Sequence, residues 1–148
     1  MKEIKFRGLN GETGWHYGIP LTNKLGTYII FEKNPHICSQ YHYIEIDEFE
    51  VVKKETVSQW TGRLDKNSVE IYNGDIVVVE NYNHHGKNPK KVMVVYYDNL
   101  TTQYCTKVEK TNFKIEDLIM ENQPLCFAHS IEVIGNVYEN PELLEQEK

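Results

Sequence analysis

Three carboxylates, Asp65, Glu70 and Asp75, are the residues best suited to acid–base chemistry, because neighbouring carboxylates can hold and transfer a proton. All three lie in or beside turn-forming segments, where carboxylates commonly accept hydrogen bonds from backbone N–H groups. Nothing near them in the sequence supplies a nucleophile, a metal or an oxyanion site. We therefore expect structural roles and assign no catalytic residue. A small hydrolase or nuclease built from scattered Asp, Glu and His residues is kept as an alternative.

Histidine and cysteine can bind metals, and two groups of them are close in the sequence. His36 and Cys38 stand two residues apart with His42 nearby, but no second pair of ligands and no recognised zinc spacing follow. His84 and His85 are adjacent, and adjacent side chains of an extended backbone point in different directions, so they rarely bind one ion together. We expect neither a metal site nor a bound cofactor.

The most basic local segment is the polar loop that contains the two adjacent histidines. Loops on a rigid scaffold often carry binding residues, so we take as the candidate binding surface His84, His85, Lys87, Lys90 and Lys91. The chain as a whole has a formal net charge of −6 at pH 7. Because a general nucleic-acid-binding protein needs clustered Lys and Arg to neutralise phosphates, a nucleic-acid partner is the less favoured alternative.

Aromatic side chains offer a second route to nucleic acid, because bases can stack on them. The candidates are Trp60, Tyr72 and Tyr138. Each lies within or beside an apolar strand, which favours packing in a core or an interface.

Two turn signatures precede the most apolar strand of the chain. The segment Asp65-Lys66-Asn67-Ser68 is rich in side chains that bond to nearby backbone, and it predicts the turn of a hairpin. Asn73-Gly74 is the commonest pair for a turn that needs positive φ. Ile76 to Val79 follows at once, and its unbroken apolar run predicts a strand covered on both faces. We expect the core to form here.

Three segments of the chain resemble the signature blocks of the YopX family. They are KEIKFRGLNGETGWHYG (Lys2 to Gly18), ETVSQWTGRLDKNSVEIYNGDIV (Glu55 to Val77) and IEVIGNVYENPELL (Ile131 to Leu144). YopX proteins are small proteins of phages and prophages of low-GC bacteria. The resemblance therefore implies a mainly β protein encoded by a mobile element, and it carries over no established activity.

The structural motif residues of these blocks lie in turns, strands and one helix start: Trp60, Gly62, Asp65, Asn67, Tyr72, Gly74, Asp75, Gly135, Asn140 and Pro141. Two positions depart from the family pattern. Trp60 stands where the family more often has Tyr or Phe, and Ser68 stands where it usually has Gly. If φ is positive at Ser68, the change strains the turn by about 1 kcal/mol.

Periodicity elsewhere predicts further strands and short helices. Alternating and apolar runs from Lys2 to Phe31 predict N-terminal hairpins. Residues 91–97 and 101–108 read as strands that follow Ile76 to Glu80, and residues 113–121 read as a short helix. Residues 131–138 predict a closing strand with Gly135 at a bulge or a close approach. Asn140-Pro141 then predicts the start of an acidic helix.

These elements favour a mainly β, single-domain protein with one or two short helices. We expect a small antiparallel barrel-like core of the Src-homology or KOW-like sort over residues 55–140. An N-terminal β-sheet or hairpin arm occupies residues 1–54, and a short acidic helix occupies residues 141–148. Because the arm has exposed strand edges, strand exchange between subunits and a homo-oligomer are expected.

Composition indicates where the protein acts. Three widely spaced cysteines, with no C-x-x-C and no signal peptide, favour reduced thiols in a bacterial host cytoplasm. The longest apolar runs are four residues, far short of the ~20 that span a bilayer, so we expect a soluble protein with no membrane partner. The favoured function is a non-enzymatic phage or prophage accessory protein that binds a host or phage protein as an oligomer.

Overall fold

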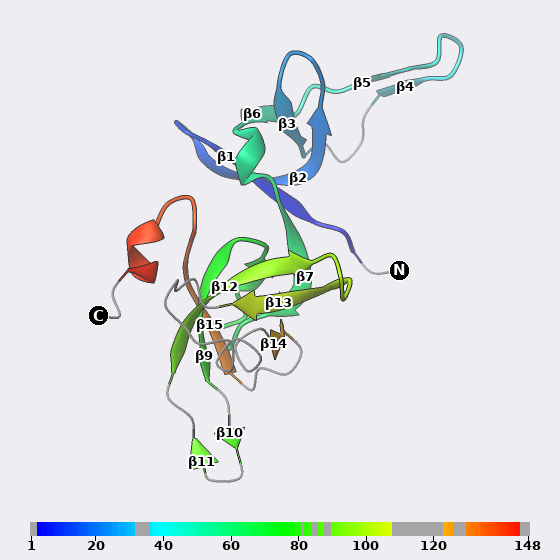
Figure 1. Cartoon of the computed structure of the whole chain (residues 1–148). Helices are drawn as coiled ribbons and strands as arrows, with labels where there is room; N and C mark the ends of the chain where they lie inside the picture. Colours follow the sequence, from blue (N-terminus) through cyan, green and yellow to red (C-terminus); the bar gives the residue numbers. More distant parts are fainter. Residues whose placement is uncertain are drawn as a thin grey trace. The chain divides into compact units, whose positions relative to one another are not determined.

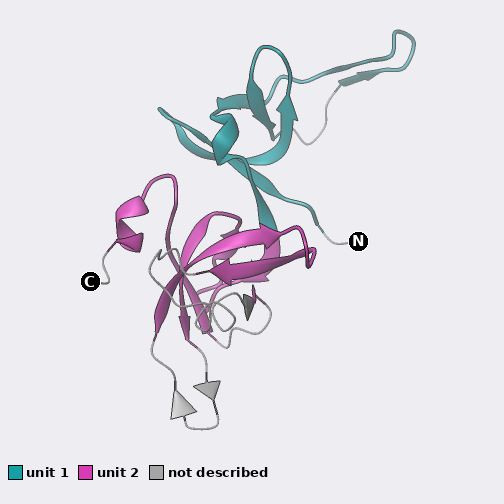
Figure 2. Cartoon of the chain, viewed as in Figure 1, with its two compact units in different colours: residues 1–60 teal, residues 61–148 magenta. Residues whose placement is uncertain are grey.

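The computed structural model describes residues 3–31, 36–80, 82–83, 86–87, 90–107, 123–125 and 130–145 (Figure 1). The protein is mainly β, as predicted, and its registered strand pairs are antiparallel. The chain divides into two compact units, Met1–Trp60 and Thr61–Lys148 (Figure 2). The predicted boundary between arm and core, near residue 55, lies a few residues before this division. That the whole chain forms one domain stays a prediction.

Unit 1 is built on a curled antiparallel sheet with the strand order β6-β3-β2-β1. Its strands are β1 (Phe6–Asn10), β2 (Gly14–Thr22), β3 (Thr27–Ile30) and β6 (Phe49–Val52). A turn of 3-10 helix, η1 (Lys54–Thr56), follows β6. Strand β7 (Ser58–Leu64) then pairs with β1 and leads the chain into unit 2.

Two glycines allow the sheet of unit 1 to curl tightly. A Cβ on Gly18 would lie 2.0 Å from the carbonyl oxygen of Ile30, and one on Gly8 would lie 2.8 Å from Cγ2 of Val52. The inner face of the sheet therefore packs Ile29 and Val52, both buried, directly against glycine backbone. Because the small residues face inward, the large apolar residues of β2 face outward.

A separate two-stranded ribbon interrupts the sheet between β3 and β6. Strands β4 (His36–Cys38) and β5 (Tyr43–Glu45) pair antiparallel, with Ile37 opposite Ile44. The ribbon extends away from the sheet of unit 1 (Figure 1). We call it the β4–β5 arm.

Unit 2 contains a five-stranded antiparallel sheet with the order β14-β13-β12-β9-β15. The strands are β9 (Asp75–Glu80), β12 (Lys91–Asp98), β13 (Gln103–Lys107), β14 (Gln123–Pro124) and β15 (Ser130–Asn136). Two short strands, β10 (Tyr82–Asn83) and β11 (Gly86–Lys87), form a ribbon between β9 and β12.

The core of unit 2 lies on the central strands of this sheet. One face packs the cluster Ile71, Val77, Val79, Met93, Val95, Leu125 and Ile131. Ile76 and Val94, which point to the opposite face, are buried as well. The prediction that the run from Ile76 to Val79 is covered on both faces is therefore confirmed.

The barrel prediction needs correction. Over the described residues the sheets stay open, and none of them closes into a barrel. The Asn73-Gly74 turn explains part of the difference: β8 (Glu70–Tyr72) pairs with β7, whereas β9 joins the other sheet. A hairpin across this turn would have kept β8 and β9 in one sheet. A likeness to Src-homology or KOW-like domains stays a prediction.

The helix predictions have mixed outcomes. The C-terminal segment forms one turn of 3-10 helix, η3 (Pro141–Leu144), with Pro141 at its first turn, in place of a longer α-helix. Asn140 occupies the N-cap position, but its side chain makes no capping hydrogen bond there. The predicted helix at residues 113–121 lies outside the described residues.

Candidate functional site

Asp65 is a structural carboxylate. Its Oδ1 accepts hydrogen bonds from the N–H groups of Asn67 at 2.7 Å and Val69 at 2.9 Å, and its Oδ2 accepts one from Val133 at 3.0 Å. Burial alone would raise the pKa of Asp65, but these three donors and the charge of Lys66 outweigh it and hold the pKa below its ordinary value. The carboxylate closes the turn between β7 and β8 and anchors that turn to β15.

The same turn covers the outer edge of β15. The N–H of Lys66 donates to the carbonyl oxygen of Ile131 at 2.9 Å, and the Lys66 ammonium lies 2.5 Å from the carboxylate of Glu132. The hydrogen bond from Lys66, and the charges of Lys66 and Lys90, hold the pKa of Glu132 below its ordinary value. An edge strand that would otherwise be open to pairing is thus occupied by the chain's own turn.

Asp75 has a second structural role. It is 1% exposed, and its Oδ2 accepts a hydrogen bond from the N–H of Tyr72 at 2.7 Å. This side-chain bond spans the Asn73-Gly74 turn and takes the place of a ladder bond between β8 and β9. The Tyr72 hydroxyl donates to Oε2 of Glu70 at 2.7 Å. The three carboxylates of the predicted acid–base group thus all bond to groups within a few residues of them, and Asp65 bonds to Val133 of β15 as well.

Gly74 joins two strands through its backbone. Its N–H donates to the carbonyl oxygen of Val95 at 2.8 Å, and its carbonyl oxygen accepts from the N–H of Val137 at 3.0 Å. Its φ is +83°, a conformation that glycine adopts without strain. Because Cε2 of Tyr138 would lie 3.3 Å from an added Cβ, the ring packs closely on the turn.

The last motif residues, Gly135, Asn140 and Pro141, form a compact end to β15. The register shifts between Val133 and Gly135, so the strand has a bulge there. An added Cβ on Gly135 would lie 2.6 Å from Oδ1 of Asn140. That same oxygen accepts a hydrogen bond from the N–H of Asn136 at 3.3 Å.

Trp60 and Gly62 lie on β7. The Lys5 ammonium sits 4.8 Å from the centroid of the Trp60 ring, so a cation covers one part of this aromatic. Gly62 has a φ of +85° within the strand. Tyr72 is 1% exposed, which removes its ring from any surface on which a base could stack.

The predicted basic surface is described only in part. His84 and His85 lie outside the described residues, and of Lys87 only the backbone is described, in β11. Lys90 and Lys91 are exposed. Because the charge of Lys90 acts on Glu132, positive charge here is partly balanced by a carboxylate from a distant part of the sequence.

A metal site is not found among the described residues: no group of three or more His, Cys, Asp or Glu side chains is arranged to hold an ion there. His36 and Cys38 lie on the β4–β5 arm, and His42 lies in its tip with a φ of +57°. Over all the residues that the structure describes, no helical segment is long and apolar enough to cross a membrane.

The most conspicuous surface feature of unit 1 is an exposed apolar face on its sheet. Strand register places Ile19 beside Ile30 and Ile30 beside Phe49, and cross-strand partners point to the same side of a sheet. Ile19 is 66% exposed. The apolar face, as we define it, consists of Tyr17, Ile19, Leu21, Tyr28, Ile30, Phe49 and Val51.

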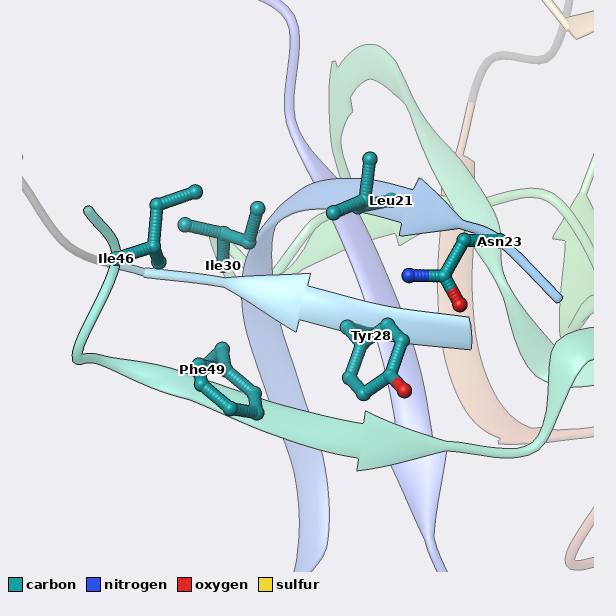
Figure 3. Close-up of a pocket in the computed structure, with 6 residues that line it drawn as sticks. All are labelled: Leu21, Asn23, Tyr28, Ile30, Ile46 and Phe49. Atoms are coloured by element: carbon teal, nitrogen blue, oxygen red, sulfur yellow. The ribbon is translucent and has the colours of Figure 1, made fainter. Parts of the chain in front are cut away.

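Part of the apolar face is hollowed into a groove of about 210 Å³. Figure 3 shows its lining, with Ile46 at one end and Asn23 at the other. Between them lie Leu21, Tyr28, Ile30 and Phe49, and the rings of Tyr28 and Phe49 meet edge to face with centroids 5.6 Å apart. The groove offers apolar contact with one amide at its end, and none of the described residues that line it is charged.

This face was missed because an amphipathic strand is normally assumed to bury its apolar side. Tyr17, Ile19 and Leu21 alternate in β2, and alternation by itself indicates a face without saying which face is buried. The available signal was on the other side of the strand, where Gly18 and Pro20 are too small and rigid to form an ordinary solvated face.

Fold and surface together define a small antiparallel β protein. It has an exposed apolar face, and its Asp65 and Asp75 carboxylates accept hydrogen bonds from backbone N–H groups at turns. The family model described as YopX protein matches residues 5–145. The chain therefore belongs to the YopX family, and the resemblance drawn from its three sequence blocks is confirmed.

A solved structure supports the fold over nearly the whole length. The crystal structure of protein EF1440 from Enterococcus faecalis covers 97% of this chain and 99% of that chain, with a TM-score of 0.56 and 23% sequence identity. At that identity the likeness concerns the fold alone. No curated protein matches the chain.

Proposed function

We propose that this YopX protein is a non-enzymatic accessory protein of a phage or prophage, and that it works as an oligomeric protein-binding module. The observation that carries the proposal is the apolar face of unit 1. Ile19, Phe49 and Val51 are each well exposed on it. Contiguous apolar surface of this kind marks protein contact sites, because leaving it in water is unfavourable.

The chemistry of the carboxylates supports a binding role over catalysis. Asp65 accepts three backbone N–H groups and Asp75 is buried against the turn that it bridges. A general base needs an available lone pair directed at substrate, and these oxygens are engaged by the fold. A hydrolase or nuclease would have to use other residues.

Charge supports a protein partner over nucleic acid. The chain has a formal net charge of −6, and the charge of Lys90 contributes to lowering the pKa of the Glu132 carboxyl. Phosphate recognition depends on clustered, unneutralised cations.

The cysteines, of which Cys38 and Cys105 are free thiols, fit the reducing cytoplasm of a bacterial host.

The test is capture of partners from phage-bearing host cells with the tagged full-length chain, in the presence of nuclease. Ile19→Asp places a charge on the apolar face, and Leu100→Asp makes the same kind of change at a side chain that is 94% exposed in unit 2. We expect a protein that is captured by the native chain and by Leu100→Asp, and lost with Ile19→Asp.

Three results would count against the proposal. A partner that both variants retain would remove the apolar face from the binding site. Nuclease-sensitive capture alone would favour nucleic acid. Turnover of a phosphodiester or an ester by the purified chain would make the enzyme reading correct.

A further inference from the structure

The β4–β5 arm is a ribbon with almost no contact surface of its own. Ile37 is 67% exposed and Ile44, its cross-strand partner, is 59% exposed. Tyr41 and Tyr43 are exposed as well. An isolated two-stranded hairpin is at best marginally stable in water, because stability needs a third strand or a packed face. Within the described part of its own chain, the arm therefore lacks a surface against which its apolar side chains could pack.

The groove on the apolar face is the matching feature. It is lined by aliphatic and aromatic side chains, together with the amide of Asn23 and the hydroxyl-bearing ring of Tyr28. Ile46 follows β5 directly and also forms one end of the groove (Figure 3). Arm and groove thus adjoin on one chain, and the ribbon of the arm extends away from the sheet that carries the groove (Figure 1).

We infer that the β4–β5 arm of one chain binds the groove of a second copy, and that the second copy's arm binds the groove of the first. Such a twofold exchange is closed, because each chain contributes both halves of the contact. It rests on the proposed function, since the groove belongs to the apolar face.

The area available suits a pair of chains. Five side chains, Ile37 and Ile44 on one face of the arm and Leu21, Phe49 and Val51 at the groove, are each about half exposed or more. At roughly 100 Å² apiece they offer about 500 Å² per chain and about 1,000 Å² in a symmetric pair. That total reaches the lower limit of a specific interface before any backbone is counted, whereas a foreign occupant of the groove alone would bury far less.

Charge does not oppose the association. Among the described residues, the groove lining has no side chain that is charged at neutral pH, and the paired strands of the arm carry His36 opposite Glu45. Glu45 is the one carboxylate in the paired strands of the arm, so little of the net charge of −6 lies on the two surfaces that meet. Two copies can approach without like-charge repulsion at the contact, and a partner selected by strong charge would gain nothing there.

The test is the mass of the full-length chain in solution, measured by sedimentation over a hundredfold range of concentration. The arm variant is Ile37→Asp with Ile44→Asp, the groove variant is Leu21→Asp, and Leu100→Asp is the matched control. We expect the native chain and the control to be dimeric. Each of the other variants should weaken dimerisation at least tenfold with an unchanged circular dichroism spectrum.

Mixing the two variants separates this arrangement from other dimers. A heterodimer of the arm variant and the groove variant keeps one intact arm and one intact groove that face each other, so the equimolar mixture should dimerise more strongly than either variant alone. An arm-to-arm or groove-to-groove dimer would not recover on mixing.

A monomeric native chain, a dimer that the arm variant leaves intact, or a failure to recover on mixing would each overturn the inference. If a foreign protein is still captured through Ile19, these outcomes leave the protein-binding part of the proposed function standing, and a monomeric native chain removes only its oligomeric part. Conversely, an arm-dependent dimer that captures no foreign protein would retain the inference and confine the apolar face to self-association.

Discussion

Single side chains decide how the turn between β7 and β8 holds unit 2 together, and Asp65 is the most informative of them. Because the pKa of this carboxyl is lower in the folded chain than in the unfolded chain, its ionised form stabilises the fold. That contribution is present at any pH above the unfolded value near 3.9, and it is lost as the pH falls through the folded value.

We expect Asp65→Asn to lower the free energy of unfolding at pH 7 by about 1–3 kcal/mol. The amide can still accept from Asn67 and Val69, but its NH2 group would face the N–H of Val133. Urea unfolding at pH 7 and at pH 3 measures the effect, and the gap between variant and native chain should shrink at the lower pH. An equal gap at both pH values would contradict it, and Glu12→Gln, in an exposed hairpin loop, serves as control.

Ser68 provides a second test at the same turn. Its φ is +65°, in the left-handed region that costs a residue with a Cβ about 1 kcal/mol relative to glycine. We expect Ser68→Gly to raise the free energy of unfolding by that amount, measured as a higher urea midpoint with an unchanged slope. Ser39→Gly, at an exposed position without positive φ, should give no gain. Equal effects of the two substitutions would show that the positive φ of Ser68 does not destabilise the folded chain.

At the scale of elements, Gly18 controls the pairing of β2 with β3. A Cβ there would lie 2.0 Å from the carbonyl oxygen of Ile30, and backbone can yield only by separating the strands. We expect Gly18→Ala to destabilise the chain by about 2 kcal/mol or more. Gly11→Ala is the matched control, because its Cβ would meet Lys53 at 3.6 Å, an ordinary contact. Thermal unfolding of both variants measures the difference, and similar melting temperatures would contradict the close approach.

Elements whose cause is local were the ones that the sequence predicted well. The Asp65 turn and the buried run from Ile76 to Val79 follow from side chains within a few residues of each other. The sheet to which β8 belongs does not, because the Tyr72 N–H bonds to the Asp75 side chain and leaves β9 to pair elsewhere. Strand order depends on such non-local pairing. Local sequence patterns therefore could not predict that β8 and β9 belong to different sheets, and the predicted barrel was wrong.

The candidate site shows the same division. Charge in the sequence led to the loop at residues 84–91, but the carboxyl on which Lys90 acts, that of Glu132, lies on a strand far along the sequence. The apolar face was missed because β2 turns the side that carries Gly18 inward, which leaves its apolar side exposed. In both cases the deciding contact joins residues far apart in the sequence, which no spacing rule reports.

For the whole molecule, we expect the rate of hydrogen exchange to depend on protein concentration in the β4–β5 arm and not in the central strands of unit 2. Strands β9 and β12 have both faces covered, so their amides exchange through extensive unfolding at any concentration. The β4–β5 arm is protected, on the inference above, only when a second copy covers it. We expect hydrogen exchange at residues 36–45 to slow at least severalfold between dilute and concentrated samples, with exchange at Val77 and Val94 unchanged. The arm variant Ile37→Asp with Ile44→Asp should exchange rapidly in both samples, and concentration-independent exchange of the native arm would contradict the exchanged pair.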